Sequence, residues 1–412
     1  MATDTTTSAN GHIDEIKNEA DGQKYPLDIA VIGGGIIGVM VALGLLHRGF
    51  HVTVYERAAA LPEIGAAFAF TGVARECMVR LNPIVLAALS RVGEANKNPM
   101  NRYWDGFNPK TKEQAENEEE SLLFRLSARD LDYWGCLRSS LLCQMVDELP
   151  TGIVQFSKQL ESYVDVEAND KVLLRFVDGT TAEADAVIGC DGIHSRTRQL
   201  LLGEGIPAAK THYSHKVVYR ALLPIKDAVS ALGEDKANNQ CTHLGPNAHI
   251  VSFPVANWTL LNVFVFLHDP EEWPDRNRMV TPGTREDVEN AVRDWSPGVR
   301  ELVSMFPENI TRWGIYDTAE HPAPTYAIGR VCLAGDSGHA TTPFHGAGAC
   351  MGVEDALVLA TALETAVAYP EYRKRKAKTI SAALQAYSDM RLERSHWLVD
   401  SSRVMGDIYE WR

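Results

Sequence analysis

The chain has 412 residues, which is enough for one large domain or two closely joined domains with a sizeable core. Its 40 basic and 54 acidic residues give a formal net charge of −14, which argues against nucleic acid as the main partner. Seven cysteines without regular spacing favour a reducing compartment over a disulfide framework, and no CxxC or HxxxH-type cluster predicts a metal site.

The first 24 residues are polar and lack the apolar stretch of a signal peptide, so we predict a disordered lead-in. No run of 18 apolar residues occurs, and no transmembrane helix is therefore predicted. Together with the cysteine pattern, these features lead us to expect a soluble, cytoplasmic protein.

A strand, a glycine-rich loop and a helix form the first strongly patterned stretch. Asp28–Ile32 is a short apolar run typical of a buried parallel strand, and the loop Gly33-x-Gly35-x-x-Gly38 then opens a helix. Gly33 permits the tight turn, Gly35 lets the backbone approach a pyrophosphate, and Gly38 lets the helix lie close to the strand. The phosphates would bind the unpaired N–H groups at the helix N-terminus. This pattern predicts a dinucleotide site; the alternative is a glycine-rich turn without a ligand.

A second apolar run, His51–Tyr55, ends at Glu56, whose carboxylate can accept hydrogen bonds from a ribose diol. Residues 65–72 are almost all small or aromatic, which suits either close approach to a flat ligand or simple tight packing. Helical periodicity then predicts helices at Val73–Leu81 and Pro83–Arg91.

Residues 96–120 are polar and end in the acidic run Glu116–Glu120, which predicts a solvated loop. Aromatic residues before that run suit either a pocket wall or a surface anchor: Tyr103, Trp104 and Phe107. A further helix is predicted at roughly Ser139–Leu149, directly after Arg138. Because an arginine at a helix start opposes the helix dipole, we expect Arg138 to face an anion, and a dinucleotide phosphate is the obvious candidate.

Strands are predicted at Val154–Tyr163, Val172–Phe176 and Thr181–Glu183. A buried strand, Ala186–Ile188, then delivers Asp191 at its carboxyl end, the edge at which ligands bind in parallel sheets.

Alternating, aromatic-rich runs from about residue 213 to 269 predict an antiparallel sheet with strands at Val217–Leu223, His249–Pro254 and Trp258–Leu267. Arg220 lies inside the first of these strands. A charge in an apolar strand is costly unless it is paired or faces a ligand. Arg220 therefore either meets a ligand or reaches solvent from an edge strand.

A second strand-to-loop-to-helix pattern follows predicted helices at Arg285–Trp295 and Gly298–Met305. Asp336 comes directly after its strand, where a carboxylate can bind sugar or ribityl hydroxyls. The mostly small residues 346–352 open a helix, predicted at Val353–Ala368, and their N–H groups can face an anion or a polar ring edge. The chain closes with a long charged helix, predicted at Glu371–Leu398.

Three elements in this order resemble a group A flavoprotein aromatic hydroxylase, the class of p-hydroxybenzoate and salicylate hydroxylases. They are Gly33-x-Gly35-x-x-Gly38 with Glu56, Asp185…Cys190-Asp191-Gly192…Ser195…Arg198, and Gly335-Asp336…Pro343…Gly346-Ala347-Gly348-Ala349. The finer texture is similar to salicylate hydroxylase-like FAD monooxygenases of fungal secondary metabolism: Tyr219-Arg220, Pro343-Phe344-His345-Gly346 and Glu354-Asp355-Ala356.

The resemblance implies a mixed α/β fold, in which a Rossmann-like FAD-binding domain is interwoven with an antiparallel-sheet substrate domain and followed by C-terminal helices. The expected division is a lead-in at 1–24, an FAD-binding domain at 25–100, 130–212 and 325–370, a substrate domain at 101–129 and 213–324, and a helical segment at 371–412.

The resemblance also implies roles for individual residues. Gly33, Gly35 and Gly38 would hold the FAD pyrophosphate, and Glu56 the adenosine ribose. The remaining FAD contacts would be Arg138, Ala69 along the cofactor, Asp191 with Gly192 (which would also serve the reduced nicotinamide), Asp336 at the ribityl chain, and Gly348 with Ala349 at the isoalloxazine.

Arg220 matches an arginine that pairs with the substrate phenolate in relatives that hydroxylate and dearomatise phenolic polyketides. Where some relatives have a second anchoring tyrosine, this chain has Phe253, and Tyr103 or Trp104 could take part of that task. His345 replaces a glutamine or glycine common in the family, and we expect it to be solvated or at the flavin edge.

The implied reaction is NAD(P)H-driven hydroxylation of a small phenol by O2 through a C4a-hydroperoxyflavin. A homodimer is the oligomeric state to be tested. The alternatives are a salicylate-type decarboxylative hydroxylase, a reductase or dehydrogenase on the same fold, and a non-enzymatic FAD-binding regulator. A flavin halogenase would need a WxWxIP stretch, which is not found in the sequence.

Overall fold

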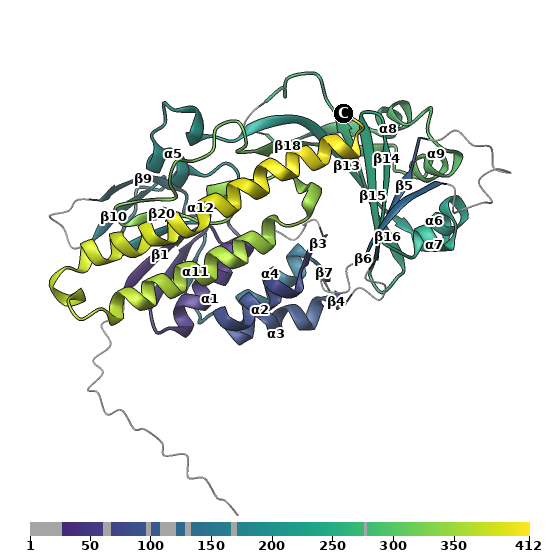
Figure 1. Ribbon diagram of the computed structural model, residues 1–412. Helices are drawn as coiled ribbons and strands as arrows, with labels where there is room; N and C mark the ends of the chain where they lie inside the picture. The colour runs from purple at the N-terminus through teal and green to yellow at the C-terminus, as the bar shows by residue number, and fades with distance from the viewer. Residues whose placement is uncertain are drawn as a thin grey trace, which may run out of the picture.

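The computed structural model describes residues 27–60, 67–95, 100–107, 121–127, 133–165, 171–275 and 278–412. The predicted lead-in and the acidic run Glu116–Glu120 lie outside these residues. Figure 1 shows an elongated molecule, with a parallel sheet and its helices at one end and a large antiparallel sheet at the other.

A six-stranded sheet carries the glycine-rich loop. Its strands are β1 (Asp28–Ile32), β2 (His51–Tyr55), β8 (Val154–Gln155), β12 (Ala186–Gly189), β19 (Ala327–Ile328) and β20 (Val331–Leu333). Their order is β19-β20-β12-β1-β2-β8, and every neighbouring pair except β19–β20 is parallel. β12 and β20 are buried along their whole length, which is why they are short, continuous apolar runs.

Long helices cover this sheet: α1 (Ile36–His47), α11 (Gly348–Ala368) and α12 (Lys376–Tyr409). Shorter helices flank them: α2 (Gly72–Leu81), α3 (Pro83–Val92), α4 (Arg138–Val146), α5 (Arg196–Leu202) and α10 (Asp336–His339). Two small sheets complete this half, β9 (Leu160–Asp165) with β10 (Val172–Phe176) and β11 (Thr181–Ala184), and β3 (Ala67–Phe70) with β4 (Glu94–Ala95) and β7 (Trp134–Leu137).

The second half is built on an eight-stranded sheet of order β17-β18-β13-β16-β15-β14-β5-β6. Its strands are β5 (Met100–Asp105), β6 (Leu122–Ser127), β13 (His212–Pro224), β14 (Cys241–Gly245), β15 (Ala248–Val255), β16 (Leu260–His268), β17 (Val280–Thr284) and β18 (Asn309–Asp317). One face packs on α6 (Ile225–Leu232), α7 (Glu234–Ala237), α8 (Arg285–Ala291) and α9 (Pro297–Ser304). The opposite face meets Phe344 and Tyr409 from the first half of the molecule.

Several predicted elements differ from the structure. The single strand predicted at Val154–Tyr163 is wrong, because β8 pairs with β2 whereas β9 pairs with β10 in another sheet. The predicted helices at Ser139–Leu149 and Arg285–Trp295 are shorter in the structure, and β5 was missed, because Met100–Asp105 is short and lies in a polar stretch.

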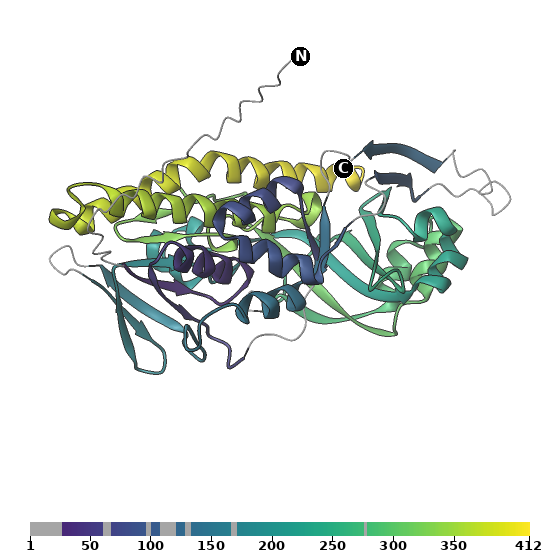
Figure 2. The ribbon, with the colours of Figure 1, turned by 90° about the horizontal axis from the view of Figure 1, so that it is seen from below.

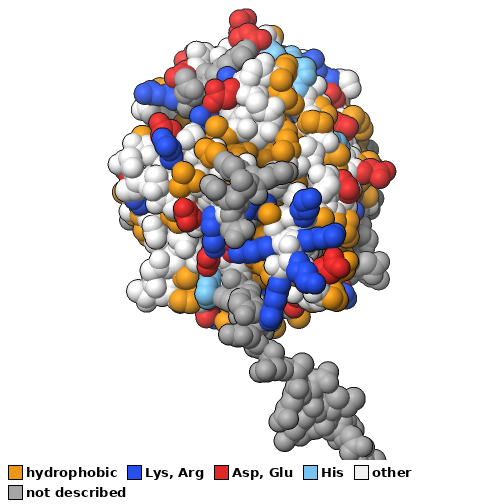
Figure 3. All heavy atoms as spheres, turned by 90° about the vertical axis from the view of Figure 1, so that its left-hand side faces the viewer, with side chains coloured by type: hydrophobic (Ala, Val, Ile, Leu, Met, Phe, Trp, Pro, Cys, Tyr) orange, Lys and Arg blue, Asp and Glu red, His pale blue; other side chains and the backbone are white. Residues whose placement is uncertain are grey.

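The last helix is displaced toward the C-terminus: α12 begins at Lys376 and continues to Tyr409, beyond the predicted end at Leu398. Figure 2 shows that it runs along the length of the molecule, from the parallel sheet to the antiparallel sheet. The face at its N-terminal end gathers Lys and Arg side chains (Figure 3), and Lys376 there pairs with the buried Asp185 at 2.5 Å. None of the helices in the described part of the chain combines the length and apolar character that crossing a bilayer requires.

Candidate FAD site and substrate-facing sheet

The predicted cofactor residues meet at one edge of the parallel sheet. Because β1, β2, β12 and β20 are parallel, the loops that follow them emerge on the same side. These loops carry Gly33, Glu56, Asp191 and Asp336. Residues more than 300 positions apart along the chain therefore lie around one site.

The three glycines of the first loop are required for different reasons. Gly33 has φ +104°, and a Cβ there would lie 2.5 Å from the carbonyl oxygen of Cys190. A Cβ on Gly38 would lie 2.0 Å from the Gly33 carbonyl oxygen, so α1 could not pack closely with any larger residue. Gly35 differs: the nearest atom to its Cβ position is an Arg138 guanidinium nitrogen at 3.6 Å. Its missing side chain leaves space on the side where a ligand would lie.

The N-terminus of α1 is open to an anion. Gly35 is its N-cap residue, no side chain caps the helix, and its first turn contains no acidic residue. Its uncapped N–H groups and its dipole suit a pyrophosphate.

Glu56 holds the glycine-rich loop. Its Oε2 accepts a hydrogen bond from the Gly34 N–H at 2.7 Å, and its Oε1 accepts one from the Ala58 N–H at 2.8 Å. A carboxylate has further lone pairs, so these bonds leave it able to accept from a diol as well. The sequence prediction for Glu56 considered only the ligand and missed this structural part.

Arg138 and Asp336 lie near enough to interact electrostatically. Arg138 begins α4, and its guanidinium lies beside Gly35. Asp336 is exposed to solvent, yet desolvation by the surrounding protein raises the pKa of its carboxyl, an effect that His339 and Arg138 only partly offset. A cation near an open helix N-terminus is the arrangement predicted for a phosphate contact.

Ala69, Gly348 and Ala349 lie close together. Cys350 on the first turn of α11 donates through Sγ to the Ala69 carbonyl at 3.6 Å, which brings β3 against the start of that helix. No side chain caps α11, and no acidic residue lies in its first turn. The structure therefore contains a second open helix N-terminus beside β3.

The carboxylate of Asp191 accepts hydrogen bonds from residues at the start of α5, the helix that follows it. It accepts hydrogen bonds from Ser195 Oγ at 2.5 Å and from the Thr197 N–H at 2.9 Å. Burial raises the pKa of Asp191, although these hydrogen bonds act in the opposite direction. Gly192 has φ +76° and open space at its Cβ position. In this loop, the backbone at Gly192 rather than the Asp191 side chain therefore has room for a ligand.

A buried network that the sequence did not reveal supports the third loop. Asp355 Oδ2 accepts from the Gly335 N–H at 2.8 Å and pairs with His339 Nε2 at 2.5 Å, while its Oδ1 accepts from Arg391 Nε at 2.7 Å. Gly335 has φ +65°, and Asp336 follows it. The network fixes the turn that presents Asp336.

These residues fit FAD. The cradle offers two uncapped helix N-termini, a glycine (Gly35) whose side chain would enter it, and the carboxylates of Glu56 and Asp336. The donors suit phosphates and the acceptors suit ribose and ribityl hydroxyls.

Arg220 lies on the sheet face that is turned toward the cradle. Along β13, Val217, Tyr219 and Ala221 are buried against the helices, so Arg220 points to the opposite face, where Val218 also lies. It is not on an edge strand, because β13 pairs with both β16 and β18, and that alternative is wrong.

The guanidinium of Arg220 stacks 4.1 Å from the centre of the Trp313 ring. It is half-buried, burial lowers its pKa, and among the described residues no carboxylate lies within salt-bridge distance of it. It also borders an open hollow with Val280, Pro282 and Thr311. A half-buried cation of this kind suits an anionic partner.

The structure separates the other candidate substrate residues. Phe253 lies on the Arg220 face, with its ring 5.9 Å from that of Phe264. Tyr103 belongs to the same face, whereas Trp104 points to the other side, where Lys236 covers its ring at 4.4 Å. The suggestion that Trp104 anchors substrate is therefore wrong, and both β5 aromatics are buried, which excludes a surface anchor at these positions.

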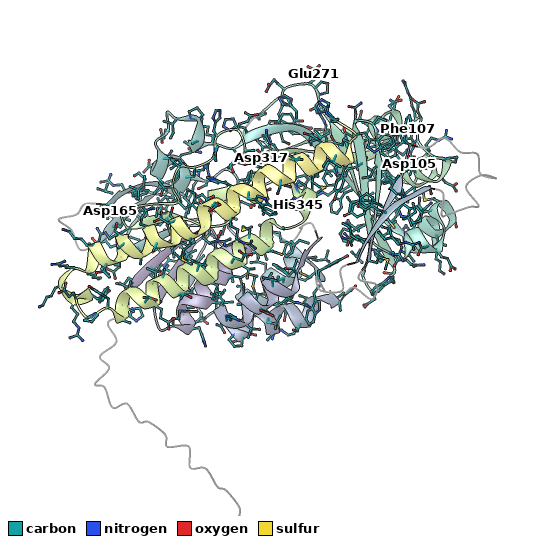
Figure 4. All side chains as sticks on the ribbon, viewed as in Figure 1. Asp105, Phe107, Asp165, Glu271, Asp317 and His345 are labelled. Carbon is teal, nitrogen blue, oxygen red and sulfur yellow. The ribbon has the colours of Figure 1, made fainter. Side chains whose placement is uncertain are left out.

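His345 is exposed on the loop before α11 (Figure 4). Its Nε2 lies 3.1 Å from Ser401 Oγ, and its ring is parallel to that of Trp397 with centroids 6.4 Å apart. Partial burial lowers its pKa. It packs on α12 rather than on any described residue of the cradle.

One group of potential metal ligands occurs among the described residues: His212, Glu320 and His321. Their ligand atoms all lie within 4.8 Å of one another. None of them belongs to the cradle.

Comparison with known proteins identifies the family of this chain. Residues 138–402 match the family described as FAD binding domain, and residues 28–138 match FAD dependent oxidoreductase. A FAD-dependent monooxygenase of Aspergillus terreus is 59% identical over 389 residues, which cover 94% of this chain and 89% of that protein. A salicylate hydroxylase of Sarocladium schorii is 43% identical over 403 residues, covering 94% and 83%.

Solved structures support the same fold. A salicylate hydroxylase in a substrate complex has a TM-score of 0.80 and 28% identity, covering 94% of this chain and 90% of that chain. Klebsiella pneumoniae HpxO with FAD and uric acid has a TM-score of 0.74 and 26% identity, covering 93% and 89%.

Fold and cradle together define a flavoprotein whose cofactor is FAD. The chain belongs to the FAD-dependent monooxygenases of salicylate hydroxylase type, and the predicted fold class and family are confirmed.

Proposed function

We propose that this monooxygenase uses NAD(P)H and O2 to hydroxylate a phenolic small molecule of polyketide type, by a hydroxylation that can dearomatise the ring. The observation that carries the phenolic substrate is Arg220, a half-buried guanidinium with no described carboxylate partner on the face turned toward the cradle. The names of the relatives support the monooxygenase class but do not name a shared substrate.

In this proposal Arg220 binds the ring oxygen of the substrate. A fixed cation stabilises phenolate relative to phenol, so it lowers the pKa of the bound hydroxyl and makes the ring a better nucleophile. The same contact orients the ring, because Trp313 limits where the guanidinium can point. Phe253 and Phe264 supply apolar surface on the same face, which excludes water from the ring.

The cofactor contacts are part of the proposal. Gly33, Gly35, Gly38 and Arg138 would hold the pyrophosphate, and Glu56 the adenosine ribose. The other contacts would be Ala69 along the cofactor, Asp191 with Gly192 in the loop that also serves the nicotinamide, Asp336 at the ribityl chain, and Gly348 with Ala349 at the ring. Bound FAD supplies the electron transfer from NAD(P)H and the activation of O2.

A decarboxylative hydroxylase of salicylates is the second candidate. It is favoured by the salicylate hydroxylase names among the relatives and solved structures. A guanidinium pairs with a carboxylate as well as with a phenolate, so Arg220 suits both substrates. A reductase or dehydrogenase is the third candidate, and its product would gain no oxygen.

The deciding experiment is NAD(P)H oxidation by the purified yellow protein, with and without a panel of phenols, resorcinol aldehydes and salicylates. Mass spectrometry on the same samples identifies the product. Substrate-stimulated oxidation with a gain of one oxygen supports the phenol hydroxylase, and loss of CO2 with that gain supports the second candidate. Stimulated oxidation without oxygen gain supports a reductase, and none across the panel contradicts the proposed substrate class.

Cytoplasmic location and a homodimer belong to the same proposal. All seven cysteines are unpaired thiols, which suits a reducing compartment. Light scattering on the purified protein would measure the oligomeric state, and fractionation of the producing cells would test the location.

A further inference from the structure

A buried ionic cluster joins the end of α12 to the antiparallel sheet. Glu410 lies just after the helix and is fully buried. Its Oε2 accepts a hydrogen bond from Lys216 Nζ of β13, and its Oε1 lies 3.2 Å from His249 Nδ1 of β15. Lys216 also pairs with Asp407 at 2.9 Å. One side chain thus connects two strands of the sheet to the last turn of α12.

The cluster encloses the ring of Phe344. Lys216 Nζ lies 5.6 Å from the centre of this ring, and the His249 ring meets it edge to face at 5.1 Å. From α12, Gly406 packs so closely that a Cβ there would lie 2.5 Å from the Phe344 ring. Phe266 closes the remaining side at 5.4 Å. Phe344 is therefore clamped between the sheet and the end of the helix.

α12 also holds the residues on either side of Phe344. Ser402 Oγ donates to the Thr342 carbonyl at 2.8 Å and accepts from the Thr342 hydroxyl at 2.8 Å. His345 Nε2 lies 3.1 Å from Ser401 Oγ. The segment 342–345 leads directly to Gly348 and Ala349 at the start of α11, where the cradle begins.

The sheet side of the clamp leads to Arg220. Phe266, which touches Phe344, pairs with Val218 of β13, and Arg220 is the next residue outward on the same face. Phe344 therefore contacts the sheet on the face that carries Arg220, four residues before the start of α11.

We propose that Glu410 is a positioning residue: by holding Lys216 and His249 it fixes Phe344, and with it the spacing between the cofactor loop and the substrate-facing sheet. This inference rests on the proposed function for the meaning of that spacing. A buried ion pair adds little net stability compared with apolar residues of the same size, so fixed geometry is what the cluster supplies. Burial lowers the pKa of His249, which keeps the ring neutral and lets Nδ1–H donate to Glu410.

Glu410→Gln tests the clamp, because it removes the charge and keeps the size, while Asp407 still neutralises Lys216. Glu393→Gln, at an exposed position of the same helix, is the matched control. Hydrogen exchange of segment 341–349 is measured with and without FAD and without substrate. Losing a charge-assisted hydrogen bond should speed exchange there by roughly tenfold or more in Glu410→Gln only. Unchanged exchange in that segment would overturn the proposal.

A second variant separates the positioning of segment 341–349 from the stability of the whole protein. Lys216→Met combined with Glu410→Gln removes both charges, so it leaves no buried charge of this pair without its partner. With FAD content and melting temperature near wild type, we expect this protein to keep fast exchange at 341–349 and to yield less product per NAD(P)H consumed. Full recovery of the product yield together with stability would mean that Glu410 is only structural. If wild type itself shows no substrate-stimulated oxidation, the proposed function fails while the exchange result still decides the clamp.

Discussion

The buried guanidinium of Arg198 donates from Nη1 to the backbone carbonyl of Gly338 at 2.6 Å. The same nitrogen reaches the Ser337 carbonyl at 3.1 Å, and Nε donates to the Ala208 carbonyl at 2.6 Å. Arg198 belongs to the helix that follows the Asp191 loop, whereas Gly338 follows Asp336. One side chain therefore ties two loops of the FAD cradle together.

Arg198→Met should destabilise the protein by about 2–5 kcal/mol, because it leaves buried carbonyls without donors. Burial lowers the pKa of Arg198 only to about 10, so the charge is present at neutral pH. Urea unfolding of the FAD-free and FAD-saturated proteins measures the loss. Arg196→Met is the control: Arg196 lies two residues away and pairs near the surface with Glu204, so its loss should cost below about 1 kcal/mol. Equal losses would contradict the assigned role.

Glu56 should matter for FAD affinity even where the fold survives. Glu56→Gln keeps one acceptor oxygen but cannot serve both the Gly34 and Ala58 N–H groups as the carboxylate does. We expect the dissociation constant for FAD to rise about tenfold or more, since a hydrogen bond to a charged group contributes ~1.5–3 kcal/mol. Titration of the FAD-free protein, followed by flavin fluorescence, measures it. Glu183→Gln, on the exposed side of β11, should leave the affinity unchanged.

Local patterns predicted those parts of the site that one segment builds alone. The glycine-rich loop with α1, and the strand before Asp336, depend on neighbours within about ten residues, so glycine spacing and apolar runs were sufficient. The structure then confirmed where these segments lie, while the ligand contacts of the individual residues remain predictions.

Contacts between distant segments could not be predicted. Asp355 binds Arg391 on another helix, and Glu410 binds Lys216 almost two hundred residues away. Sequence periodicity describes only neighbouring residues, so it could not predict either pair. The C-terminal part of α12 was missed for the same reason, because its serines and Gly406 look unfavourable for a helix until Phe344 and Thr342 pack against them. The signal that was available but overlooked is Ser195, a typical N-cap residue: its Oγ accepts from the Arg198 N–H at the start of α5 and donates to Asp191.

Asp355 should make the free energy of unfolding depend on pH in the acidic range. Burial alone would raise the pKa of its carboxyl, but His339, Arg391 and the Gly335 N–H outweigh burial and hold the pKa at about 2. A carboxyl with a lowered folded-state pKa stabilises the protein above its unfolded pKa near 3.8, and this stabilisation is lost as the pH falls toward 2. The shift corresponds to about 2 kcal/mol.

Unfolding free energies of wild type and Asp355→Asn, measured between pH 5 and pH 2, test this dependence. We expect the difference between the two proteins to shrink by about 2 kcal/mol across that range. Asp389→Asn, at an exposed position of α12, provides the control and should follow wild type throughout. A difference that stays constant with pH would mean that Asp355 is not the group that titrates.

Arg220→Gln should separate substrate chemistry from cofactor binding. Arg220 touches Trp313 and no described residue of the cradle, so FAD content and melting temperature should stay close to wild type. Turnover of a phenolic substrate should fall about a hundredfold or more, because the buried hydroxyl loses a charge-assisted contact of ~3 kcal/mol. Steady-state kinetics with the best substrate of the panel measures this loss. Arg293→Gln, at an exposed position between α8 and α9, is the control. If FAD content and turnover fell together, Arg220 would have a structural role and not a role in substrate binding.

Gly35 and Gly38 should fail in different ways when each is replaced by alanine. The Cβ position at Gly35 has only the Arg138 guanidinium within reach, at 3.6 Å, and its φ of −74° suits any residue. Gly35→Ala should therefore fold with nearly wild-type stability but lose FAD affinity by at least about tenfold, because the new methyl occupies the approach to the α1 N-terminus. Gly38→Ala places a methyl 2.0 Å from the Gly33 carbonyl oxygen, so α1 must move away from its strand.

The second substitution should thus cost stability by about 1–3 kcal/mol before any ligand is added. Melting of the two FAD-free proteins, followed by FAD titration, distinguishes the outcomes. Normal FAD affinity in Gly35→Ala would mean that the pyrophosphate does not pass over this residue. Normal FAD-free stability in Gly38→Ala would mean that the helix can shift without cost, and the close packing at Gly38 would then not be what requires a glycine there.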